Sequence, residues 1–145
     1  MEVLRQKTIL AADDDADILE LLRDALTHEG YAVVTASDGK QAWQKIRKDN
    51  PDIIILDLMM PEMDGFTVLK KLRASPPGDK WQPVIILSAL GDLKHMRKGF
   101  FLEADHYITK PWDMKDILKG IHLMEKLILQ RKDKADIDIE TAKNI

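Results

Sequence analysis

The sequence contains no cysteine, which excludes disulfides and thiolate metal ligands. It also lacks an apolar run near the roughly 20 residues that cross a bilayer, and its N-terminus has no signal-peptide core. No glycine-rich phosphate loop is present, so nucleotide binding is not expected. The net charge of −3 disfavours nucleic-acid binding driven by bulk charge. A cytoplasmic protein, with neither a membrane nor a nucleic-acid partner, is the resulting expectation.

Short apolar runs alternate with segments of helical periodicity along the 145 residues. The apolar runs predict five strands, at 8–12, 31–36, 53–57, 84–87 and 107–109. A helical pattern follows each of them, and Asp15 is a plausible N-cap for the first helix. This alternation predicts an α/β fold: a flavodoxin-like, doubly wound, five-stranded parallel sheet in the order 2-1-3-4-5, surrounded by five helices.

The end of the chain differs in composition from the rest. The last helical pattern runs from about Asp113 to Gln130, and the residues after Arg131 are charged and lack a sustained apolar face. We therefore expect one domain over residues 1–130 and a charged tail over 131–145, read as a frayed helix end and a mobile segment.

Acidic residues follow two of the predicted strands. The first strand ends at Asp13 and Asp14, and the buried run at 53–56 ends at Asp57. The predicted strand order puts these two strands side by side, so the three carboxylates should converge. Carboxylate oxygens at a sheet edge suit Mg²⁺, and a carboxylate can also accept a phosphoryl group. Taken singly, each acidic residue could instead start a turn or cap a helix.

Two further polar residues end the last two strands. Lys110 can supply positive charge, and Ser88 can donate a hydrogen bond to a phosphoryl oxygen. In isolation Ser88 is better explained by an ordinary turn, and Lys110 by a solvated surface position. Together with the three carboxylates, however, they form one set on successive β/α units.

This set resembles the receiver domain of two-component response regulators over roughly residues 6–130. The matching segments are Ile9–Asp15, Ile55–Gly65, Ser88–Ala89 and Tyr107–Pro111. The resemblance implies that Asp57 is the phosphoacceptor and that the Lys110–Pro111 bond is cis. It implies Mg²⁺, with Mn²⁺ as a substitute, held by Asp13, Asp14, Asp57 and the backbone carbonyl of Met59. It also implies that Ser88 and Lys110 contact the phosphoryl group and that Ser88 and Tyr107 form the switch.

The implied function is that of a signalling switch without enzyme activity of its own. A sensor histidine kinase or a phosphotransfer protein would phosphorylate Asp57, and we expect a stand-alone receiver. Two alternatives are a Mg²⁺-dependent phosphatase working through an aspartyl-phosphate and a degenerate receiver that only docks proteins. The first needs a general acid where Met59 stands, and the complete acidic set disfavours the second.

Apolar side chains in two places lead to further expectations. Leu123 and Leu127 lie to one side of the core stripe of the last helix and should be partly exposed, and Phe101 adds an aromatic residue nearby. We expect the face of helix 4, strand 5 and helix 5 to bind an output protein or a second copy. Met59 and Leu90 should flank the approach of water to Asp57 and slow dephosphorylation.

Overall fold

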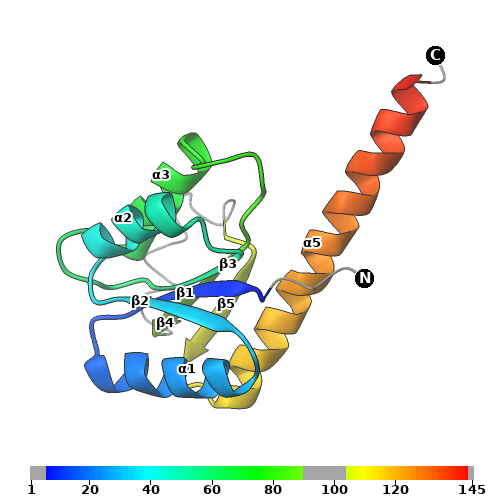
Figure 1. Ribbon diagram of the computed structural model, residues 1–145. Coiled ribbons are helices and arrows are strands. Elements are labelled where there is room, and N and C mark those ends of the chain that lie inside the picture. Colours follow the sequence, from blue (N-terminus) through cyan, green and yellow to red (C-terminus); the bar gives the residue numbers. More distant parts are fainter. Residues whose placement is uncertain (1–5, 90–103, 144–145) are drawn as a thin grey trace.

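The computed structural model describes residues 6–89 and 104–143, with side chains up to residue 134. Within these residues, one parallel sheet has the strand order β2-β1-β3-β4-β5, as predicted (Figure 1). The strands are β1 (Thr8–Ala12), β2 (Ala32–Ala36), β3 (Ile53–Asp57), β4 (Val84–Ala89) and β5 (His106–Lys110). The parallel pairing brings the carboxyl ends of β1, β3, β4 and β5 to the same edge of the sheet.

Helices cover both faces of this sheet. In the described part of the chain they are α1 (Ala16–His28), α2 (Gly39–Asp49), α3 (Gly65–Ala74) and α5 (Met114–Lys143). Figure 1 shows α2 and α3 on one face, with α1 and α5 on the other. The side chain of Asp15 caps α1 by accepting hydrogen bonds from the N–H groups of Asp17 and Ile18, as predicted. The remaining predicted helix falls within residues 90–103, which lie outside the described residues.

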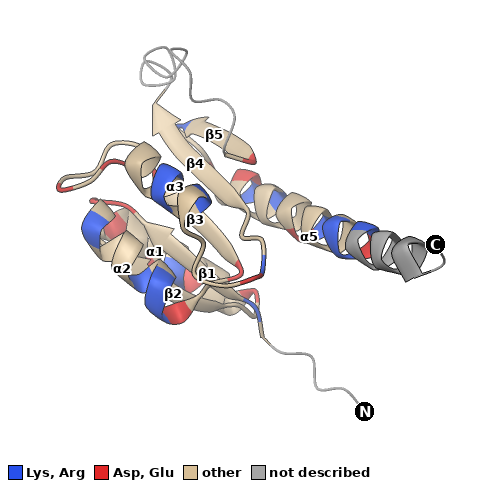
Figure 2. Ribbon diagram, turned by 90° about the horizontal axis from the view of Figure 1, so that it is seen from above, with Lys and Arg blue, Asp and Glu red and all other residues tan. Residues whose placement is uncertain are grey.

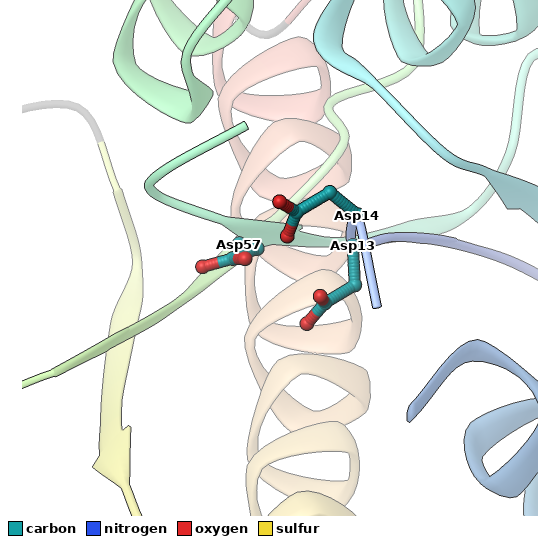
Figure 3. A group of neighbouring side chains, drawn as sticks. All are labelled: Asp13, Asp14 and Asp57. Atoms are coloured by element: carbon teal, nitrogen blue, oxygen red, sulfur yellow. The ribbon is translucent and has the colours of Figure 1, made fainter. Parts of the chain in front are cut away.

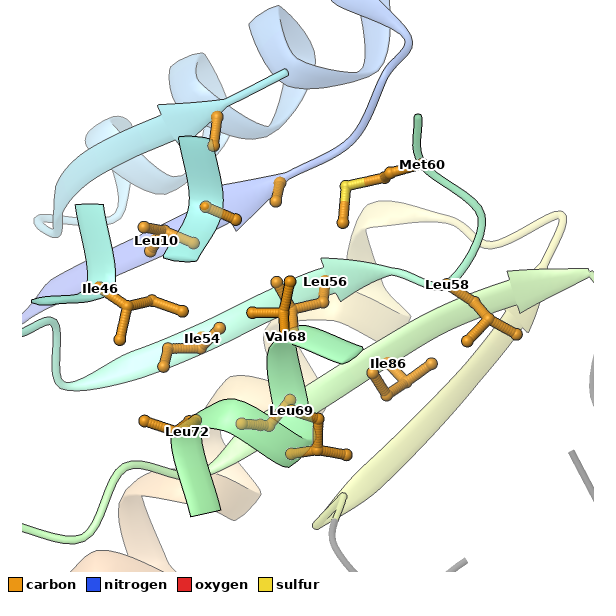
Figure 4. Packing of buried hydrophobic residues seen from close by; sticks show 14 residues of the cluster. Leu10, Ile46, Ile54, Leu56, Leu58, Met60, Val68, Leu69, Leu72 and Ile86 are labelled. Atoms are coloured by element: carbon orange, nitrogen blue, oxygen red, sulfur yellow. The ribbon is translucent and has the colours of Figure 1, made fainter. Parts of the chain in front are cut away.

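The apolar residues of the strands alternate between two cores. Leu10, Ile54 and Ile86 pack with α2 and α3 (Figure 4). Ile9, Ile55 and Ile85 pack with α1 and α5 on the other face. All five residues of β3 are buried, so this strand is covered on both faces. Because burying one such side chain contributes about 1.5–3 kcal/mol, β3 is a firmly held platform for a functional group.

The last helix is longer than predicted, and the expectation of a frayed end near Gln130 was wrong. α5 continues to Lys143, over a stretch that contains neither proline nor glycine. The guanidinium carbon of Arg131 lies 3.9 Å from the ring centroid of Trp81, a cation–π contact that ties the helix to the loop before β4. Beyond this contact the helix projects away from the sheet (Figure 1). A domain boundary at residue 130 stays a prediction.

Lysine, arginine and acidic residues are distributed along the helices (Figure 2). Among the described residues, no helix is both long enough and apolar enough to cross a membrane. Even the long helix α5 carries lysine, arginine and acidic residues along its length.

Candidate functional site

The structure brings the three predicted carboxylates together. Asp13 directly follows β1 and Asp57 ends β3, and these two strands pair in parallel. One carboxylate oxygen from each of Asp13, Asp14 and Asp57 lies within 4.8 Å of the other two (Figure 3). Asp13 and Asp57 are buried, with 0% and 4% of their surface exposed, whereas Asp14 is exposed. The cluster therefore combines two buried carboxylates with one, that of Asp14, which is open to solvent.

Lys110 provides the positive charge of this cluster. Its Nζ lies 3.3 Å from Oδ1 of Asp57 and 3.6 Å from Oδ2 of Asp13. It reaches them from the end of β5, and the Lys110–Pro111 peptide bond that follows is cis, as expected. Both distances are within ion-pair range, but both are longer than a strong charged hydrogen bond. The ammonium group therefore lies beside the carboxylates but leaves their oxygens able to bind another cation.

Ser88 and Tyr107 lie on the two neighbouring strands. Asp57 is in register with Leu87 of β4, and Ser88 is one residue further along. Ser88 is fully buried, and its Oγ has no hydrogen-bond partner among the described residues. Tyr107 on β5 is half-buried against the core beneath α2 and α3. A buried hydroxyl without a hydrogen-bond partner costs free energy. Binding of a group that brings an acceptor oxygen to this hydroxyl would therefore be favoured.

Charge repulsion and burial perturb the ionisation of the site. Burial and the negative charge of Asp13 raise the pKa of the Asp57 carboxyl to about 6, against the opposing effect of Lys110. Burial also raises the pKa of Asp13. Burial acts to lower the pKa of the Lys110 ammonium, but the charges of Asp57 and Asp13 outweigh it and raise that pKa. Counting the described residues alone, three carboxylates face one ammonium, which leaves an excess of negative charge.

A divalent cation fits this arrangement. The donor set consists of hard carboxylate oxygens, which Mg²⁺ prefers over nitrogen or sulfur. Oδ2 of Asp13 is buried and accepts no hydrogen bond from the described residues. Its other oxygen, Oδ1, is held by the N–H of Asp15 at 2.9 Å, which fixes the orientation of the carboxylate. The acidic cluster of Asp13, Asp14 and Asp57 could hold such an ion.

The backbone at the end of β3 lies very close to the start of α3. Met59 donates its N–H to Oδ1 of Asp57 at 3.4 Å, and its side chain is 59% exposed. A Cβ on Gly65 would lie 2.5 Å from the carbonyl oxygen of Asp57, so only glycine lets α3 begin this close to the end of β3. The other residue predicted to control water access, Leu90, lies outside the described residues.

Comparisons with known proteins agree on one family. The family model described as "Response regulator receiver domain" matches residues 9–122. "Response regulator GtcR" of Aneurinibacillus migulanus is 44% identical over 107 residues, covering 74% of this chain and 43% of that protein. "Probable transcriptional regulator ycf27" of Guillardia theta is 38% identical over 130 residues, covering 90% of this chain and 48% of that protein.

Solved structures give the same result. The Francisella response regulator 1452 receiver domain superposes with a TM-score of 0.73 at 34% identity, covering 83% of this chain and 98% of that one. A CheY-like receiver domain protein from Methanospirillum hungatei gives 0.76 at 31% identity, covering 89% and 99%. The chain belongs to the response regulator receiver domain family of two-component regulatory systems. It spans about half the length of the curated relatives it matches.

Proposed function

We propose that this receiver is switched by phosphorylation of Asp57. The observation that carries the proposal is the convergence of a buried strand-end carboxylate, two neighbouring carboxylates, the Lys110 ammonium and the Ser88 hydroxyl, which has no hydrogen-bond partner within the described part of the chain. A carboxylate nucleophile flanked by charge-neutralising groups and a hydrogen-bond donor is what phosphoryl transfer requires. The donor would be a sensor histidine kinase or a phosphotransfer protein.

The proposed chemical step is an in-line displacement. A carboxylate oxygen of Asp57 forms a bond to phosphorus as the bond from phosphorus to the donor's histidine nitrogen breaks. The leaving nitrogen keeps the electron pair and takes a proton from solvent. Lys110 lies 3.3 Å from Asp57 and balances negative charge on the transferred oxygens, and Ser88 supplies a hydrogen bond to one of them. Water later cleaves the acyl phosphate, releasing inorganic phosphate and restoring the carboxylate.

The metal belongs to the same proposal. Asp13, Asp14, Asp57 and the backbone carbonyl of Met59 would hold Mg²⁺, or Mn²⁺ in its place. When bound, the ion neutralises the carboxylates and the phosphoryl oxygens. The test is incubation with acetyl phosphate, with Mg²⁺ or with a chelator, followed by intact-mass measurement. We expect a mass gain of one phosphoryl group only when Mg²⁺ is present.

The lifetime of the phosphorylated state should depend on Met59. Its exposed thioether offers an attacking water almost no hydrogen bonding. We expect Met59→Asn to dephosphorylate roughly fivefold faster, because one added hydrogen bond is worth about 1 kcal/mol. The measurement is loss of the phosphoryl mass after the donor is removed. Met59→Leu keeps an apolar side chain and should decay like the wild type, and equal rates in all three proteins would remove Met59 from control of water access. The same role for Leu90 stays a prediction.

We propose that the switch signals through the surface of β5 and α5, together with the helix predicted within residues 90–103. Repositioning of Ser88 and Tyr107 on phosphorylation would bias this face between two arrangements. A groove of about 420 Å³ runs between β5 and α5, and Thr109, Lys119 and Leu123 are among its lining residues. Leu123 is 42% exposed, and Leu127 is partly exposed as expected. An output protein or a second copy would cover these apolar groups.

Self-association through this groove can be tested with a charged substitution. Leu123→Glu should weaken dimer formation about tenfold or more, because a carboxylate would be desolvated in the interface. Leu129→Glu is the matched control, since Leu129 is 57% exposed on the same helix and does not line the groove. Light scattering over a concentration series, with and without Mg²⁺ and beryllium fluoride, gives the result. A wild type that stays monomeric throughout would leave only an output protein as the partner.

A further inference from the structure

The loop between β3 and α3, residues 58–64, which we call the acceptor loop, rests on the first residue of α2. Gly39 donates its N–H to the carbonyl oxygen of Pro61 at 3.4 Å, and Met63 donates its N–H to the same oxygen at 2.7 Å. A Cβ added to Gly39 would lie only 1.7 Å from the carbonyl oxygen of Met63 and 2.5 Å from its carbonyl carbon. The contact is therefore backbone against backbone, with room for a hydrogen atom only.

The acceptor loop has a conformation that its own sequence does not favour. Glu62 has φ 68°, in the left-handed region that residues other than glycine seldom adopt. Such a conformation persists where the surrounding structure imposes it. The start of the loop is fixed, because Leu58 donates its N–H to Leu87 at 2.9 Å and accepts from Gly65 at 2.8 Å. In the middle of the loop, buried Met60 and the contact with Gly39 provide the constraint.

Of the two touching backbones, α2 is the more firmly held. Ala42 and Ile46 on α2 are fully buried, and Asp38 caps the helix by accepting the N–H of Gln41 at 2.7 Å. The acceptor loop instead exposes the side chains at positions 59, 61 and 62. A side chain at position 39 would therefore displace the loop until the 1.7 Å separation had about doubled to an ordinary contact.

We propose that Gly39 is a positioning residue for the acceptor site, acting through the acceptor loop on Met59. This inference rests on the proposed function, in which the backbone carbonyl of Met59 is a metal ligand. Met59 is two residues before Pro61, between the fixed Leu58 and the point where α2 supports the loop. A shift of the loop moves this carbonyl while leaving Asp57 in place, because Leu58 is anchored on both sides. The expected consequence is weaker metal binding with an intact phosphoacceptor.

The test compares Gly39→Ala with Gly78→Ala, because a Cβ on Gly78 meets its nearest atom at an ordinary 3.5 Å. Mg²⁺ affinity is measured by titrating the amide spectrum of each isotope-labelled protein. We expect Gly39→Ala to bind Mg²⁺ about tenfold more weakly, as for other changes behind a metal ligand. Its metal-free spectrum should differ from wild type at residues 59–64, and saturating Mg²⁺ should restore phosphoryl uptake from acetyl phosphate. A folded Gly39→Ala protein with wild-type Mg²⁺ affinity overturns the proposal.

The wild-type protein gives a second measurement that needs no variant. Mg²⁺ should shift the amide signal of Gly39, whose N–H donates to Pro61, and leave that of Gly78 unchanged. A Gly39 signal that does not respond, in a protein whose other site signals do, overturns the proposal. A protein that shows no response to Mg²⁺ anywhere and no uptake from acetyl phosphate refutes the proposed function, and this inference with it.

Discussion

Asp57→Asn will abolish phosphoryl uptake from acetyl phosphate, whereas Asp24→Asn will leave it intact. The amide of asparagine has nearly the shape of the carboxylate but is a very poor nucleophile, so the site keeps its packing and loses its acceptor. Asp24 is an exposed carboxylate on α1 and controls for the loss of one negative charge. The measurement is intact mass after incubation with acetyl phosphate and Mg²⁺, with circular dichroism as the check on folding.

Two neighbouring carboxylates make this a demanding test. Asp13 and Asp14 both offer an oxygen within 4.8 Å of one on Asp57, so either is a potential alternative acceptor. Asp14 is exposed, whereas Asp13 and Asp57 are both buried, and Lys110 lies 3.6 Å from the first and 3.3 Å from the second. A mass gain in Asp57→Asn equal to that of the wild type would refute the assignment. Peptide mapping of the modified protein would then identify which carboxylate is the acceptor.

The sheet could be predicted because its signals are local and repeated. Each strand is a short run of β-branched or apolar residues, and β3 is the clearest, with three consecutive isoleucines before Leu56. Parallel order and right-handed crossovers then restrict the arrangement to a few possibilities. The acidic cluster followed from the same reasoning, since Asp13 and Asp57 end strands that the predicted order makes neighbours.

Contacts that the strand order does not determine could not be predicted. The length of α5 was underestimated because composition alone marked the residues after Arg131 as a tail, and no sequence pattern pairs Arg131 with Trp81. No sequence pattern marks Gly39 as a contact residue, because the contact depends on the position of Met63 in space. Periodicity reports which face of an element is buried, but it does not report which backbone touches it.

Asp57→Asn should also make the metal-free protein more stable at neutral pH. The pKa of the Asp57 carboxyl is about 6 in the folded protein, against the ordinary aspartate value of 3.8 expected in the unfolded chain. The folded form therefore binds the proton more tightly. The contribution of this group to stability is therefore greatest below pH 3.8 and falls as the pH rises through 6. Near pH 7 the buried charge costs about 3 kcal/mol, at about 1.36 kcal/mol per pKa unit.

The raised pKa of Asp57 already includes the attraction of Lys110, so the expected gain in the free energy of unfolding is up to about 3 kcal/mol. Urea unfolding of both proteins with a chelator, at pH 7 and pH 5, measures it. At pH 5 the advantage of Asp57→Asn should shrink to about half, because the carboxyl of the folded wild type is then mostly protonated. Added Mg²⁺ should stabilise the wild type and do much less for the variant, which lacks one ligand charge. A variant less stable than wild type at pH 7 without metal would mean that the ion pair with Lys110 outweighs the repulsion among the carboxylates.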